Sequence, residues 1–158
     1  KGTAAAQSPG IAAHERMVID AAKAILAAHL RKPGFELTSP ACTREYLQLH
    51  LADRDVEAFV VLFLSADHSL IACEELFRGT LRQTAVYPRE VVRRALAHNA
   101  ASVIFAHNHP TGRPDPSHAD RVLTQTLKLA LSTFDIGVLD HVIVAGEKTT
   151  SFAEQGLL

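Results

Sequence analysis

Hydrophobic and polar positions alternate with a helical period in the first part of the chain and gather into apolar runs later. From Ile11 to Leu30, apolar residues recur every three to four positions, which predicts an amphipathic helix. The proline and glycine of Arg31–Gly34 end this helix. Ser39-Pro40 then indicates a second helix start, a capping serine followed by proline, and this helix is expected to end near Leu51.

Short apolar runs predict the strands of a sheet. The runs Ala58–Leu64 and Ala100–Ala106 are apolar throughout, as in strands that are buried on both faces. Three further strands and two further helices are expected at His68–Cys73, Glu74–Leu81, His141–Ala145, Pro88–His98 and His118–Phe134. The order of these elements predicts an α/β sandwich, in which a mixed β-sheet is flanked by helices.

Composition narrows the classes of protein that the chain can represent. Its 158 residues, 47% of them hydrophobic, fit one compact domain, and its net charge of −1 does not support binding to nucleic acid. No run reaches the roughly 18 apolar residues of a membrane span, and no signal peptide is visible, so we expect no membrane contact. Two cysteines without a disulfide framework favour a cytoplasmic location.

Two histidines stand where the predicted strand Ala100–Ala106 runs out into a loop. Residues two apart on an extended backbone point to the same side, so His107 and His109 can converge on one metal ion. Asp120, in the first turn of the next helix, can add a carboxylate oxygen. Two histidines and one carboxylate leave a fourth position open, which is typical of catalytic zinc sites.

Helix capping offers another interpretation of part of this pattern. Ser117 and Asp120 have the spacing of a capping box, and taken alone they favour that structural role. Capping explains neither His107 nor His109, however, and Ser117 can cap the helix while it lies beside the metal.

The spacing from His107 through His109 and Ser117 to Asp120 reproduces the JAMM signature H-x-H-x(7)-S-x(2)-D. The wider sequence resembles the RadC branch of this MPN+ (JAB) superfamily, in segments that follow one another in its order: ELFRGTL, YPREV, HNHPTG, PS and LDH. The resemblance runs from about Ser39 to Leu158 and implies a cytidine-deaminase-like MPN fold. Residues 39–158 are therefore expected to form the RadC-type domain, and residues 1–38 a linker and the last helix of a helical N-terminal region. Thr111 stands where this family usually has serine.

The resemblance also implies a role for each site residue. His107, His109 and Asp120 would bind Zn²⁺, and Ser117 would hydrogen-bond the oxyanion of the tetrahedral intermediate. The general base of the family corresponds to Glu57, a carboxylate at the edge of the apolar run that begins at Ala58. An ordinary surface charge at the strand edge is the alternative for Glu57, and Glu75 and then Glu74 are rival candidates for the base.

The function implied is that of a zinc-dependent metallohydrolase, a metalloprotease or isopeptidase acting on an unidentified peptide or amide substrate. The stretch from Asp120 to Leu139 is too short for a large inserted segment, which argues against ubiquitin as the substrate. Two alternatives stay open: a DNA-repair accessory protein, which the charge does not support, and a non-catalytic MPN interaction module. Such modules typically lose metal ligands, whereas this sequence keeps them.

Overall fold

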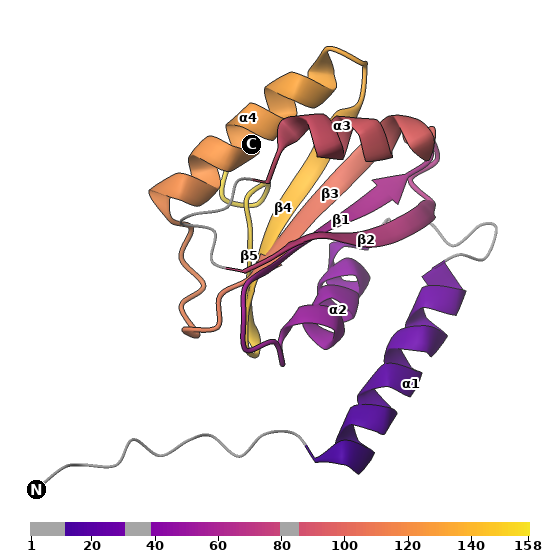
Figure 1. Ribbon diagram of the computed structural model, residues 1–158, viewed down its shortest axis with the longest axis vertical. Helices are drawn as coiled ribbons and strands as arrows, with labels where there is room; N and C mark the ends of the chain where they lie inside the picture. Colours follow the sequence, from indigo (N-terminus) through magenta and orange to yellow (C-terminus); the bar gives the residue numbers. More distant parts are fainter. Residues whose placement is uncertain (1–11, 31–38, 80–85) are drawn as a thin grey trace, which may run out of the picture.

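The structure is a computed structural model that describes residues 12–30, 39–79 and 86–158 (Figure 1). Two helices come first, α1 (Ala13–Leu30) and α2 (Pro40–Leu51), close to the predicted ranges. Ser39 precedes α2 in an extended conformation, although its side chain makes no capping hydrogen bond. Ion pairs of Arg16 and Lys23 with Asp53 connect α1 to the end of α2.

Five strands form one mixed sheet in the order β2-β1-β3-β4-β5. They are β1 (Ala58–Leu64), β2 (Leu70–Arg78), β3 (Ser102–Asn108), β4 (Gly137–Ala145) and β5 (Lys148–Ser151). Strand β1 runs antiparallel to β2 and β3, β3 runs parallel to β4, and β4 runs antiparallel to β5. The predicted α/β class and mixed sheet are confirmed.

Helices cover both faces of the sheet, as Figure 1 shows. Helix α2 packs on one face, where Leu47 and Leu51 join Leu62 and Ile104 in an apolar cluster. Helices α3 (Pro88–Ala97) and α4 (His118–Ser132) cover the other face, with Phe59, Val61, Phe105, Leu127 and Leu131 in a second cluster. Odd-numbered residues of β1 and β3 thus point towards α3 and α4, and even-numbered residues point towards α2.

Two details of the strand prediction were wrong. The segments expected as separate strands at His68–Cys73 and Glu74–Leu81 contribute to one strand, β2, over the residues described. Register shifts in its pairing with β1 leave Ile71 and Leu76 without direct partners, and each shift changes the face on which the following side chains lie. The alternation of side chains between the two faces is therefore interrupted, although the strand continues without a turn. Strand β5 was not predicted, because its sequence KTTS is short and polar.

Among the residues that the structure describes, no helix combines the length and the apolar character needed to cross a membrane.

Candidate metal centre

The two histidines and the aspartate of the predicted site come together at one edge of the sheet. His107 lies in β3, and His109 follows this strand directly, with its backbone N–H donating to Val144 of β4 at 2.8 Å. Both rings point towards α4, because β3 is extended and the two residues are two apart. The loop that follows contains three prolines and leads into α4, which carries Asp120 in its first turn.

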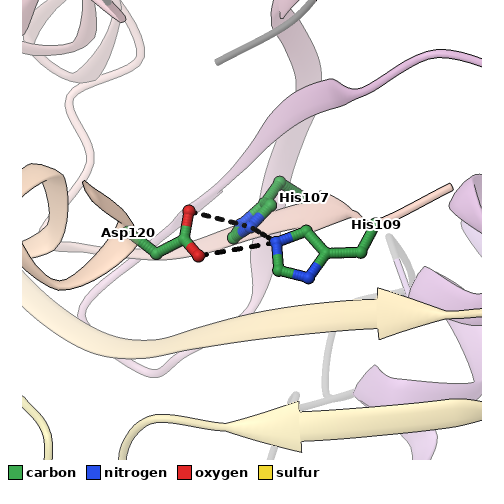
Figure 2. Close-up of side chains that lie close together, drawn as sticks. All are labelled: His107, His109 and Asp120. Carbon is green, nitrogen blue, oxygen red and sulfur yellow. Dashed lines mark hydrogen bonds and ion pairs between the residues drawn. The ribbon is translucent and has the colours of Figure 1, made fainter. Parts of the chain in front are cut away.

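The three side chains face one another (Figure 2). The Nε2 atoms of His107 and His109 are 3.0 Å apart, and the Asp120 carboxylate lies 3.3 Å from His107 Nε2 and 3.4 Å from His109 Nε2. Neighbouring ligands of a tetrahedral zinc ion, with bonds of about 2.0–2.1 Å, are separated by about 3.3–3.4 Å. The donor set therefore fits a zinc ion in both chemistry and spacing. His107 is fully buried and Asp120 is 3% exposed, so the metal position lies at the base of the site.

Electrostatics at the three side chains favour a charged carboxylate. Burial opposes the ionisation of Asp120, but hydrogen bonds from His107 and His109 hold its pKa far below the usual range. The hydrogen bond with Asp120 raises the pKa of His109, against the effect of burial, and the charge of Glu57 makes a smaller contribution in the same direction. A metal cation bound among these groups would replace the ring protons of His107 and His109 as the partner of the Asp120 carboxylate.

Ser117 and Asp120 form the predicted capping box at the start of α4. The Ser117 hydroxyl oxygen accepts from the Asp120 backbone N–H at 3.1 Å, and Asp120 Oδ2 accepts from the Ser117 backbone N–H at 2.7 Å. The role of Asp120 in capping α4 is therefore compatible with a role as a metal ligand. Since the Ser117 hydroxyl acts as acceptor in the cap, its own proton stays available for a hydrogen bond into the cleft.

Glu57 lies on the same side of the sheet as the histidines. Phe59 pairs with His107 in the antiparallel register, so Glu57, two residues earlier, falls at the level of His109 and on the same face. A cleft of about 860 Å³ is lined by Glu57, His109, Ser117, Asp120 and the loop between them, including Thr111 and Arg113.

The rival carboxylates are engaged elsewhere. Glu75 accepts from Arg78 Nε at 2.7 Å and also pairs with Arg54, while Glu74 accepts from Arg94 Nε at 2.6 Å and contacts His98. Among the described residues that line the cleft, Glu57 is present and neither rival is.

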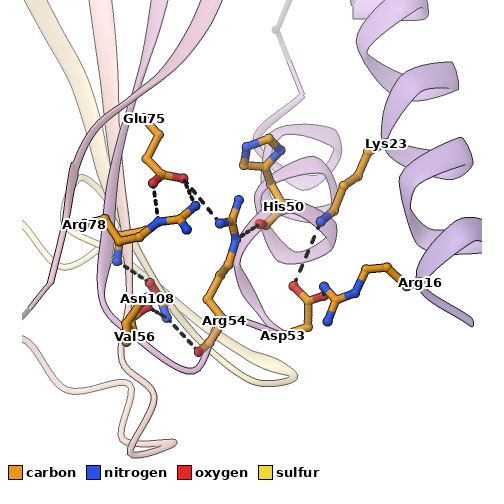
Figure 3. A network of polar contacts seen from close by, with 10 residues as sticks. Arg16, Lys23, His50, Asp53, Arg54, Val56, Glu75, Arg78 and Asn108 are labelled. Carbon is orange, nitrogen blue, oxygen red and sulfur yellow. Dashed lines mark hydrogen bonds and ion pairs between the residues drawn. The ribbon is translucent and has the colours of Figure 1, made fainter. Parts of the chain in front are cut away.

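Asn108, between the two histidines in sequence, points to the opposite face of the sheet. There its side chain contacts the backbone that leads into β1 (Figure 3). Its Oδ1 accepts from the Ala58 backbone N–H at 2.7 Å, and its Nδ2 donates to the carbonyls of Arg54 and Val56 at 3.2 and 3.1 Å. The side chain thereby fixes the backbone on both sides of Glu57 to the strand that leads to His107 and His109.

Sequence reasoning missed the contacts of His141. Its place at the start of an apolar run favours a buried histidine bonded to backbone over a residue that supports the metal site. Its ring is fully buried, but its nitrogens contact the side chains of His107 and Thr124. A bulge at Leu139 puts His141 beside Phe105 and on the face of the metal site. Thr124 lies one helical turn after Asp120, a spacing that could have directed attention to it.

Comparison with known proteins agrees with this geometry. Residues 37–157 match the RadC-like JAB domain family. The chain is 53% identical over 150 residues to the UPF0758 protein HEAR2468 of Herminiimonas arsenicoxydans, covering 95% of this chain and 66% of that protein. It is 59% identical over 125 residues to a UPF0758 protein of Janthinobacterium sp. (strain Marseille), covering 79% of this chain and 56% of the relative.

A UPF0758 protein of Thiobacillus denitrificans is 52% identical over 159 residues, which cover 98% of this chain and 70% of that protein. The chain spans less than two thirds of the Herminiimonas and Janthinobacterium proteins. With a family match that covers most of its length and relatives of this similarity, the chain belongs to the RadC-like JAB domain family.

Proposed function

We propose that this domain is a zinc-dependent hydrolase that cleaves amide bonds, of the peptide or isopeptide kind. The observation that carries the proposal is the convergence of His107, His109 and Asp120 in a cleft that also contains Glu57 and Ser117. Three protein donors leave a coordination position free, as in catalytic rather than structural zinc sites. When bound, zinc lowers the pKa of a coordinated water to about 7 and polarises a carbonyl oxygen.

Glu57 acts as the general base in this proposal. Its position on the histidine face and in the same cleft allows it to accept a proton from the attacking water and later to deliver it to the leaving nitrogen. Asn108 supports this role by holding the backbone on both sides of Glu57. A base that is already held in place loses little orientational freedom when the substrate enters, so less entropy is lost at that step.

Ser117 acts as the hydrogen-bond donor to the substrate. Its oxygen accepts from the helix backbone, which orients the hydroxyl in the lining of the cleft and leaves its proton for the carbonyl oxygen of the scissile bond. Negative charge develops on that oxygen in the transition state, and a preoriented donor there stabilises the transition state more than the ground state.

The test separates metal binding from catalysis. The wild-type protein is loaded with zinc and screened against a library of internally quenched peptides and branched isopeptides. On any substrate found, Glu57→Gln should lower the turnover rate by about 10²- to 10⁴-fold with zinc still bound. His109→Ala should lose both zinc and activity.

Glu74→Gln is the matched control, because it removes a carboxylate that pairs with Arg94 and His98 outside the cleft. Its turnover should equal that of the wild type. Undiminished turnover in Glu57→Gln would exclude Glu57 as the base, and a wild-type protein that binds no zinc would refute the proposed function as a whole.

A further inference from the structure

A chain of buried polar groups leads from helix α4 to the metal ligand His107. Thr124 Oγ1 lies 2.6 Å from the backbone carbonyl of Asp120 and 2.6 Å from Nδ1 of His141. His141 Nε2 in turn lies 2.8 Å from Nδ1 of His107. Thr124, His141 and His107 are each 0% exposed, so these groups exchange hydrogen bonds with one another rather than with bulk water.

The direction of each hydrogen bond follows from the carbonyl at the start of this chain. A carbonyl oxygen can only accept, so the single hydroxyl proton of Thr124 is donated to Asp120. The Thr124 oxygen must then accept from Nδ1–H of His141. The His141 ring is enclosed by Phe59, Phe105 and Phe152, with ring centroids 5.7, 5.8 and 4.7 Å away, and such surroundings keep it neutral.

A neutral imidazole carries one N–H, so Nε2 of His141 is an acceptor. His107 therefore donates its Nδ1–H to His141. When a cation replaces the Nε2 proton that His107 shares with Asp120, its Nε2 presents a lone pair to the space between His109 and Asp120. His109 reaches the same state by a shorter route, because its Nδ1 lies 2.8 Å from the backbone carbonyl of Arg113 and must donate to it.

We propose that Thr124 and His141 are positioning residues, which hold His107 in the Nδ1–H tautomer and so aim its Nε2 lone pair at the metal. This inference rests on the proposed zinc site and adds two residues that do not touch the metal. In this arrangement the two Nε2 atoms, 3.0 Å apart, both present lone pairs and cannot hydrogen-bond to each other. A cation between them and the Asp120 carboxylate satisfies all three groups at once.

Zinc affinity tests the role of Thr124 without any need for a substrate. The full chain is titrated with zinc in competition with a chromophoric chelator. Thr124→Val keeps the shape of the side chain but removes the hydroxyl, and it should weaken zinc binding by about 10- to 100-fold. Thr124→Ser keeps the hydroxyl and should stay within about threefold of the wild type.

Thr126→Val is the matched control. Thr126 lies on the same helix and its hydroxyl donates to the carbonyl four residues earlier, at 2.8 Å, but it is exposed and does not share the helix face of the buried Thr124. The Thr126→Val variant loses the same kind of hydrogen bond to a helix carbonyl as Thr124→Val does, and it should bind zinc with the affinity of the wild type. A Thr124→Val affinity equal to that of Thr126→Val would overturn the inference.

A second measurement requires no substitution. Long-range ¹H–¹⁵N correlation spectra of the zinc-loaded wild type distinguish protonated from unprotonated ring nitrogens, and they should show His141 protonated at Nδ1 and His107 protonated at Nδ1. Protonation of His141 at Nε2 in the zinc-bound protein would overturn the inference about Thr124 and His141. The proposed zinc site would not be affected by that result. A wild type that binds no zinc would overturn both.

Discussion

Replacement of Asn108 by alanine gives the sharpest stability test of the architecture around the site. Asn108 is 2% exposed and makes three hydrogen bonds to the backbone that precedes and begins β1. The alanine variant leaves the Ala58 backbone N–H without its partner, and Ala58 is 1% exposed, so water cannot easily replace the lost oxygen. None of the candidate metal ligands is removed.

The expected loss can be worked out from these contacts. An unsatisfied buried N–H costs about 1–3 kcal/mol, and each of the two bonds to carbonyls contributes about 0.5–1.5 kcal/mol, reduced where water reaches those carbonyls. Because Arg54 is partly exposed and Val56 is 48% exposed, most of the cost falls on Ala58. We therefore expect the free energy of unfolding to fall by about 2–4 kcal/mol, a large part of the 5–15 kcal/mol typical of a domain.

Urea unfolding in the presence of a chelator measures this loss without a contribution from metal. Amide hydrogen exchange adds a local measurement, since the Ala58 N–H should lose protection in the variant. Asn99 is the only other asparagine of the chain and serves as the control. It has a φ of 51° after α3, so Asn99→Gly should leave stability unchanged or raise it slightly. A loss below about 1 kcal/mol in Asn108→Ala would refute the proposed anchoring of this segment.

Three further outcomes are expected. Leu131→Ala, at a fully buried position, should destabilise the protein by about 2–5 kcal/mol in thermal unfolding, and a smaller loss would mean that the core closes around the cavity. Arg94 and His98 hold the pKa of Glu74 below its ordinary value of 4.5, against the effect of burial. The ion pair therefore stabilises the fold above that pH, and this stabilisation is lost as the pH falls. In Glu74→Gln, the free energy of unfolding should depend less steeply on pH, and only in this acidic range. Zinc at 100 times its dissociation constant should stabilise the wild type by about 2.7 kcal/mol in denaturant titrations but leave His109→Ala unchanged.

Strands whose residues are all buried could be predicted from the sequence alone. The run Ala58–Leu64 coincides with β1, because a strand buried on both faces is apolar throughout. Strand β2 was harder to predict, since it forms the edge of the sheet, is partly exposed and contains two register shifts that interrupt its alternation. Strand β5 has no apolar signal at all and is defined by its pairing with β4.

The same distinction applies to the site. His107, His109 and Asp120 were predictable from spacing, because a strand end and a helix start each fix the direction of nearby side chains. Glu57 required the register between β1 and β3 before it could be placed beside them. His141 required both the parallel pairing of β4 and the bulge at Leu139, neither of which leaves a local pattern in the sequence.

The capping box at the start of α4 has a consequence for the choice of a metal-free reference protein. One Asp120 oxygen is already held by the Ser117 N–H, so the carboxylate needs little reorientation to receive a cation. The same bond means that Asp120→Ala would remove a ligand and also fray the first turn of α4, where Ser117 stands. Differences between that variant and the wild type would mix helix disorder with metal loss. His109→Ala leaves the cap intact, and it is therefore the variant in which the loss of metal can be observed by itself.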